Sequence, residues 1–129
     1  MHKSQLSSIV IDCNANDLDE AAGFWSAALG WQAKPLPNED DANYRELTGP
    51  DDEIKVLVQC VDHPSRAHID IEADDIEAEV RRLEALGARR VEFVRRWWVM
   101  EAPTGQRFCV IKPQRSDFES RAHAWQEGE

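Results

Sequence analysis

The sequence has few basic residues for its many acidic ones, and no long apolar run. It holds 15 lysines and arginines against 25 acidic residues in 129, a formal net charge of −10. Nucleic acids and anionic membrane surfaces attract basic proteins, so this balance excludes both as expected partners. No apolar stretch approaches the roughly 20 residues of a membrane-spanning helix, and the first residues lack the apolar core of a signal peptide. We therefore expect a cytoplasmic protein.

Cysteine is scarce as well. Cys13, Cys60 and Cys109 are widely spaced, and no Cys-x-x-Cys pair occurs. Each lies in an apolar, strand-like run, where a free thiol packs as a small hydrophobic side chain in a reducing compartment. We expect three free thiols.

An internal repeat divides the chain into two similar halves. Residues 11–18 align with 69–76, 58 positions later, and the Ala-Leu-Gly at 28–30 aligns with that at 85–87. In each half, apolar positions at helical spacing precede this Leu-Gly, and Asn16 and Asp74 are placed to cap the helix. Each half therefore predicts a strand, a polar cap and a helix that ends at a glycine.

Short strands are expected around the two helices. In the first half they lie at 6–13, 31–36, 44–47 and 54–61, and in the second at 68–71, 89–94, 97–101 and 107–111, with turn residues between them. Each half is then a βαβββ module, too small to bury its sheet alone. We predict one α+β domain over 1–129, with module one at about 6–61, module two at about 66–113, and a polar tail at 114–129 that fits a short helix or an irregular segment.

Four segments resemble the vicinal oxygen chelate superfamily, which includes glyoxalases, bleomycin-resistance proteins and extradiol dioxygenases, and most closely its small glyoxalase-like proteins. They are DLDEAAGFW at 17–25, ALGW at 28–31, HIDIEADDI at 68–76 and APTGQRFCV at 102–110. The resemblance covers about residues 6–113. It implies two tandem βαβββ modules whose mixed, largely antiparallel sheet curls into a cup for a divalent metal and a small organic substrate.

The resemblance also implies metal ligands on the first and last strand of each module. The first-strand position is Val10 in module one and His68 in module two. The last-strand position is Cys109 in module two. In module one it falls on Val56 or Leu57, with Gln59 the nearest polar residue. A full set of oxygen and nitrogen ligands is missing, so we expect no required cofactor, and a divalent metal held partly by His68 is the alternative.

The candidate catalytic residues are His68, Asp12 and Asp70. His68 is a general base or metal ligand if it faces the cup, and an ordinary hydrogen-bonded strand residue if it does not. Asp12 and Asp70 are equivalent in the repeat, and strand alternation aims them at the same faces as Val10 and His68. Two carboxylates in a cup suit acid–base chemistry, whereas bonding to backbone or arginine is the structural alternative.

The candidate ligand-binding residues are aromatic, cationic or thiol side chains near the same strands. Trp97 and Trp98 are adjacent on a strand, so one faces in and the other out. Cys109 is a ligand, a nucleophile or a packing residue, and Arg107 is the cation closest to it in sequence. The set comprises Tyr44, Trp97, Trp98, Arg107 and Cys109.

These expectations favour a homodimeric protein that binds a small organic molecule in a tryptophan-lined cup and whose metal site is degenerate. Two enzymatic alternatives stay open. The first is a metal-dependent lyase or isomerase of the glyoxalase type that uses His68, and the second is a metal-free acid–base enzyme that uses Asp12, His68 and Asp70.

Overall fold

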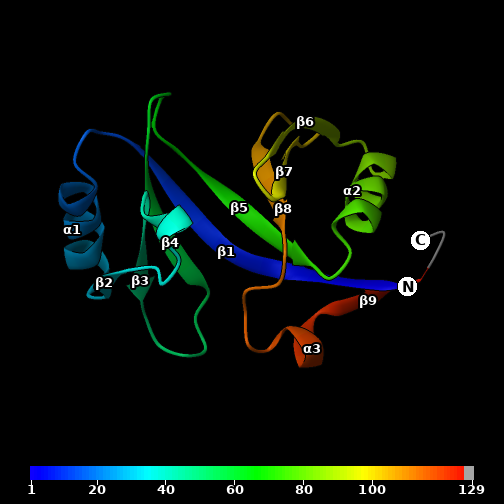
Figure 1. The fold of residues 1–129 in the computed structure, drawn as a ribbon, viewed down its shortest axis with the longest axis horizontal. Coiled ribbons are helices and arrows are strands. Elements are labelled where there is room, and N and C mark those ends of the chain that lie inside the picture. The colour runs from blue at the N-terminus through cyan, green and yellow to red at the C-terminus, as the bar shows by residue number, and fades with distance from the viewer. Residues whose placement is uncertain (127–129) are drawn as a thin grey trace. The chain divides into compact units, whose positions relative to one another are not determined.

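A computed structural model describes residues 1–126, so residues 127–129 of the predicted tail lie outside it. The chain forms two compact units. The first unit is Ser8–His68, and the second joins Met1–Ser7 to the chain from Ile69 onward. Two strands, β1 (His2–Asn14) and β5 (Arg66–Ala73), contribute residues to both units. Figure 1 shows the course of the chain.

The first unit contains one helix and a mixed sheet. After β1 come α1 (Leu18–Leu29), β2 (Gln32–Pro35), the 3-10 turn η1 (Glu39–Asp41), β3 (Tyr44–Thr48) and β4 (Lys55–Val61). The strand order is β2-β3-β4-β1, in which β4 runs parallel to β1 and the other pairs are antiparallel. The buried core of this unit consists of Ala22 on α1 and Leu47, Val56 and Val58 on the sheet.

The second unit repeats this plan. After β5 come α2 (Ile76–Ala85), β6 (Arg89–Val94), β7 (Trp97–Glu101) and β8 (Arg107–Ile111), in the strand order β5-β8-β7-β6 with β8 parallel to β5. Its core contains Val80 of α2 and Met100, Phe108 and Val110 of the sheet. The predicted α+β fold of two βαβββ repeats with a mixed sheet is therefore confirmed.

Both helices begin one residue later than the caps expected from the sequence. Asp17 and Asp75 are the N-cap residues, and their carboxylates accept hydrogen bonds from the backbone amides of Glu20 and Ala78. Asp74 instead accepts from the backbone N–H of Lys3 at 2.8 Å. Because both caps shift by the same single residue, the two repeats stay equivalent.

The described part of the tail after β8 packs against the start of β1. It forms α3 (Phe118–Arg121) and β9 (His123–Trp125), and β9 pairs antiparallel with residues 2–4. The Trp125 indole donates to Ser4 Oγ at 2.8 Å, and the Arg82 guanidinium lies 3.7 Å from the indole ring centre. This pairing explains why β1 starts four residues earlier than the predicted first strand. Among the described residues, none of the helices has both the length and the apolar character needed to cross a membrane.

Candidate active site

The first unit presents a polar face on the side of its sheet away from α1. Leu47, Val56 and Val58 pack toward the helix, so their alternating neighbours on β3 and β4 point to the opposite face. On that face Asp12 is the register partner of Gln59, and Gln59 is the register partner of Tyr44. The polar side chains of Asp12, Gln59 and Tyr44 thus form a row across β1, β4 and β3.

Asp12 and His68 form a close hydrogen-bonded pair on this face. His68 Nδ1 lies 2.7 Å from Asp12 Oδ2, and the Gln59 amide donates to Asp12 Oδ1 at 2.9 Å. Asp12 is 2% exposed, whereas the His68 side chain is 13% exposed. The carboxylate is therefore held below the surface by its neighbours, while the imidazole retains some access to solvent.

The pairing fixes the chemistry of the imidazole. A carboxylate accepts hydrogen bonds, so the Nδ1–H of His68 donates to Asp12 and Nε2 of a neutral ring carries the lone pair. A histidine held in this way can take a proton at Nε2 or bind a metal there, and the carboxylate stabilises the positive charge that results. Asp12 is thus an orienting residue for His68.

Arg66 adds a positive charge beside the pair. Its Nε lies 3.8 Å from Asp12 Oδ2, and its side chain is 46% exposed. Arg66 precedes His68 by two residues on β5, so alternation places both side chains on one face. Its guanidinium is available to an anionic group of a ligand that approaches His68.

Sequence reasoning did not identify Gln59 or Arg66 as parts of this arrangement. Gln59 appeared only as a polar neighbour of the expected ligand position. The register corrects that alignment: Asp12 pairs with Gln59 on the first parallel strand pair, and its repeat partner Asp70 pairs with Cys109 on the second. Gln59, rather than Val56 or Leu57, is therefore the counterpart of Cys109.

In the second unit, the predicted residues divide between two faces. Trp98 packs against the core that α2 covers, at 5.3 Å from the Phe93 ring and 4.9 Å from the Arg90 guanidinium. Trp97 lies on the opposite face, which alternation also assigns to Cys109 and Arg107. Trp97 is therefore the tryptophan that shares a face with the other candidates.

The polar candidates of the second unit have partners of their own. Asp70 is 8% exposed and stands in register with Cys109. Arg107 Nε lies 3.4 Å from a Glu101 carboxylate oxygen, and Arg89 contacts the other oxygen at 2.7 Å. These arginines hold the pKa of Glu101 below its ordinary value. The charge of Arg107 is thus directed toward Glu101.

Donor side chains for a metal lie on β5 and β8. Within the second unit, Asp70 on β5 and Cys109 on β8 are register partners, so their side chains share a face. A carboxylate beside a thiol suits Zn²⁺ better than Mg²⁺ or Ca²⁺, which prefer oxygen ligands. The donor types therefore fit a zinc-like ion.

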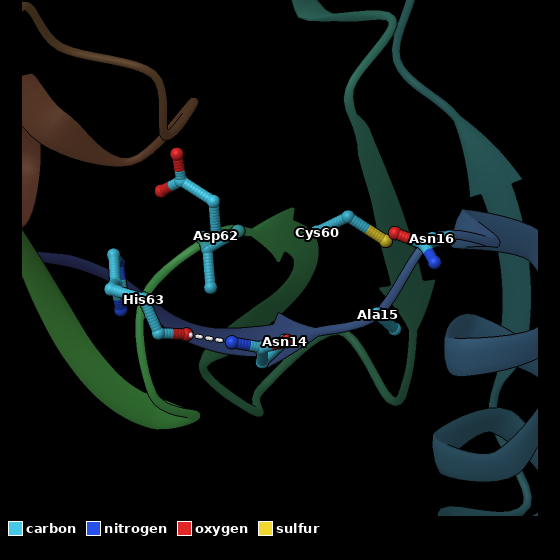
Figure 2. A pocket seen from close by; sticks show the side chains of 7 residues that line it. Asn14, Ala15, Asn16, Cys60, Asp62 and His63 are labelled. Carbon is cyan, nitrogen blue, oxygen red and sulfur yellow. Dashed lines mark hydrogen bonds between the residues drawn. The ribbon is translucent and has the colours of Figure 1, made fainter.

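The first unit also contains an open hollow, which none of the predicted site residues lines. Its volume is about 610 Å³. Figure 2 shows its wall, where the Asn14 side chain donates to the His63 carbonyl at 2.7 Å. The lining residues are Asn14, Ala15, Asn16, Cys60, Val61, Asp62 and His63. The His63 imidazole in this lining lies 2.9 Å from the Pro64 carbonyl, a backbone contact that makes this hollow a weaker candidate for catalysis.

Comparison with known proteins agrees with this fold. A methylmalonyl-CoA epimerase from Mycobacterium tuberculosis matches with a TM-score of 0.58 and 20% identity, over 85% of this chain and 88% of its own. A hypothetical protein from Bacillus halodurans C-125 matches with a TM-score of 0.55 and 15% identity, over 88% of this chain and 98% of its own.

A member of the glyoxalase/bleomycin resistance protein/dioxygenase superfamily from Vibrio splendidus 12B01 matches with a TM-score of 0.50 and 20% identity, over 82% of this chain and 99% of its own. At these identities the likeness shows the fold alone. No curated protein sequence matches the chain. The family model of the glyoxalase-like domain matches residues 8–111. The chain therefore belongs to the glyoxalase-like domain family of the vicinal oxygen chelate superfamily.

Proposed function

We propose that this protein binds a small organic molecule on the polar face of the first unit and transfers a proton to or from it through His68. The observation that carries the proposal is the 2.7 Å contact between His68 Nδ1 and the buried Asp12 carboxylate. With the Nδ1–H of His68 bonded to Asp12, Nε2 is the ring nitrogen that would take up a proton. Asp12 holds the ring in one orientation and stabilises its charged form, and Gln59 holds Asp12.

The surroundings of His68 suit a substrate that carries an anionic or strongly polar oxygen. The half-exposed Arg66 guanidinium lies beside the pair, where it can bind such an oxygen. Proton removal next to a carbonyl places negative charge on that oxygen, and a nearby cation stabilises this charge. Tyr44 on β3, which belongs to the same row as Asp12 and Gln59, is a further ligand contact.

The candidate residues of the second unit are proposed separately. There Asp70 is an acid–base residue, and Trp97, Trp98, Arg107 and Cys109 are ligand contacts. Of the two tryptophans, Trp97 has the more suitable position because Trp98 packs against the core beneath α2. We also propose a cytoplasmic homodimer without nucleic-acid or membrane partners, in keeping with the acidic charge.

The test is proton exchange in deuterated water, followed by NMR over a panel of small carbonyl compounds. The panel contains ketoaldehyde–thiol adducts and acyl-CoA thioesters, including methylmalonyl-CoA because an epimerase of that substrate shares the fold. A proton-transfer residue contributes about 10²–10⁴-fold to rate, so His68→Gln is expected to lose exchange by that factor. Asp12→Asn is expected to lose about 10–100-fold.

His63→Gln is the matched control, because His63 belongs to the same unit but bonds to the Pro64 carbonyl. It is expected to exchange at the wild-type rate. Exchange by His68→Gln at the wild-type rate would refute the proposal. Saturable binding without exchange on any panel member would instead support a pure binding protein.

A second candidate function, metal-dependent lyase or isomerase chemistry, is favoured by the donors on β5 and β8. Asp70 and Cys109 would hold the ion in the second unit, where it would polarise a bound oxygen of the substrate. Metal analysis of protein purified without chelators tests this. Stoichiometric zinc that is lost in both Asp70→Asn and Cys109→Ser supports the candidate, and wild-type protein that takes up no added zinc contradicts it.

A further inference from the structure

Two of the three cysteines stand directly opposite each other in the first unit. Cys13 on β1 and Cys60 on β4 are register partners in a parallel pair, so their side chains point to the same face. Neighbouring strands lie about 4.8 Å apart, within the roughly 4.4–6.8 Å range of Cα separations in disulfides. Both cysteines are free thiols and partly accessible to solvent.

The two thiols differ in their surroundings. Cys60 lines the open hollow of about 610 Å³, and in Figure 2 its sulfur points toward Asn16. Cys13 packs against the core beneath α1, and its thiol donates to the Ile11 carbonyl at 3.8 Å. Burial raises the pKa of Cys13, so this thiol stays protonated at neutral pH and is the poorer first nucleophile. A small oxidant therefore meets Cys60 first.

We propose that Cys13 and Cys60 are a redox modification site that closes to a reversible cross-strand disulfide when the protein meets a hydroperoxide. In the first step the Cys60 thiolate attacks the peroxide, which yields a sulfenic acid and releases water or an alcohol. In the second step the Cys13 thiol attacks the sulfenic sulfur, forms the S–S bond and releases water. The peroxide is reduced by two electrons, and the two thiols supply them.

The geometry makes this bond easy to reverse. Parallel side chains on adjacent strands keep Cβ atoms near the strand spacing of about 4.8 Å, whereas disulfides prefer about 3.8 Å. Closure must draw β1 and β4 together, and a strained disulfide is more readily reduced. Such a bond suits regulation better than permanent stabilisation.

The disulfide would act on the candidate active site through the backbone. Cys13 directly follows Asp12, and Cys60 directly follows Gln59, so the bond would close one residue beyond the Asp12–Gln59 pair. Drawing the strands together there alters the hydrogen bonds that orient His68. The inference itself concerns the two thiols and holds whether or not His68 transfers protons.

The experiment treats the full-length protein with a small excess of hydrogen peroxide, counts free thiols after denaturation and maps disulfide-linked peptides by mass spectrometry. The wild-type protein is expected to fall from three titratable thiols to one and to regain all three with dithiothreitol. Cys109→Ser, the matched control, is expected to fall from two to none. Cys13→Ser is expected to retain a sulfenic acid at Cys60 that dimedone traps.

Several results would overturn the inference. A mapped bond that contains Cys109, a bond between two molecules, or a stable Cys60 sulfenic acid in the wild-type protein would each do so. The same is true if peroxide consumes no thiol although a monofunctional alkylating agent modifies Cys60. The wild-type and Cys109→Ser results decide the matter even if Cys13→Ser fails to fold.

Discussion

Replacing Asp12 by alanine tests the arrangement around His68 without any knowledge of the ligand. The Asp12 carboxylate is 2% exposed and accepts hydrogen bonds from Gln59 and His68. Asp12→Ala removes both acceptors but leaves both donors in place. Neither donor gains full access to water, because the surrounding sheet is otherwise unchanged.

The expected loss of stability follows from the two donors, on Gln59 and His68, that lose their acceptor. A buried donor that loses its partner costs about 1–3 kcal/mol, so the pair amounts to about 2–6 kcal/mol of unfolding free energy. Domains are stable by only about 5–15 kcal/mol, so the loss is measurable and large. Asp12→Asn should cost only about 1 kcal/mol per bond, since its carbonyl accepts from His68 and its amide donates to a flipped Gln59.

Urea unfolding followed by tryptophan fluorescence measures both variants, with the exposed Asp62→Ala as the control. The expected order of stability is wild type and Asp62→Ala, then Asp12→Asn, then Asp12→Ala. If Asp12→Ala costs less than about 1 kcal/mol, or if the alanine and asparagine variants are equally stable, the hydrogen bonds do not hold the site as described.

Three further predictions concern other parts of the chain. Burial raises the pKa of Glu79, but hydrogen bonds led by the one from Arg82 outweigh burial and hold the pKa below its ordinary value of 4.5. The ionised Glu79 therefore stabilises the folded protein above about pH 4.5. This stabilisation is lost as the pH falls through the lower pKa of the folded state. Unfolding of Glu79→Gln should therefore depend less on pH in acid than wild-type unfolding does. Trp98→Ala should cost about 3 kcal/mol in denaturant titrations because Trp98 packs against the core, while Trp97→Ala on the opposite face should cost less than about 1 kcal/mol. Gly30→Ala should lower the thermal midpoint by the equivalent of about 1 kcal/mol, because Gly30 ends α1 at φ +71°.

The repeat and the apolar spacing predicted the fold because both depend on local sequence. Helical spacing from Leu18 and Ile76 placed α1 and α2, and the Leu-Gly ends placed their C-termini. The cap position was one residue early in both copies, because consecutive polar residues precede each helix and any of them can cap it. The early start of β1 was missed, since it depends on pairing with β9 at the far end of the chain.

The site was predicted only in part. Asp12 and His68 were identified as separate candidates, but their direct contact depends on how β1 and β5 approach each other. The role of Gln59 depends on the register between β1 and β4, two strands separated by a helix and two other strands. No local pattern encodes such a register. A motif search therefore finds Asp12 and His68 but does not find Gln59, which bonds to Asp12.

The duplication explains where functional differences between the two units lie. Both copies must bury apolar side chains under their helix in order to fold, and both do so with the alternate residues of their last strand: Val56 and Val58 in one, Phe108 and Val110 in the other. The opposite face carries no such requirement. There, equivalent positions hold an Asp12–Gln59 pair in the first unit and an Asp70–Cys109 pair in the second. An amide orients a carboxylate by donating to it, whereas a thiol is a weak donor and a soft metal ligand, so the two copies carry different side-chain chemistry on this face.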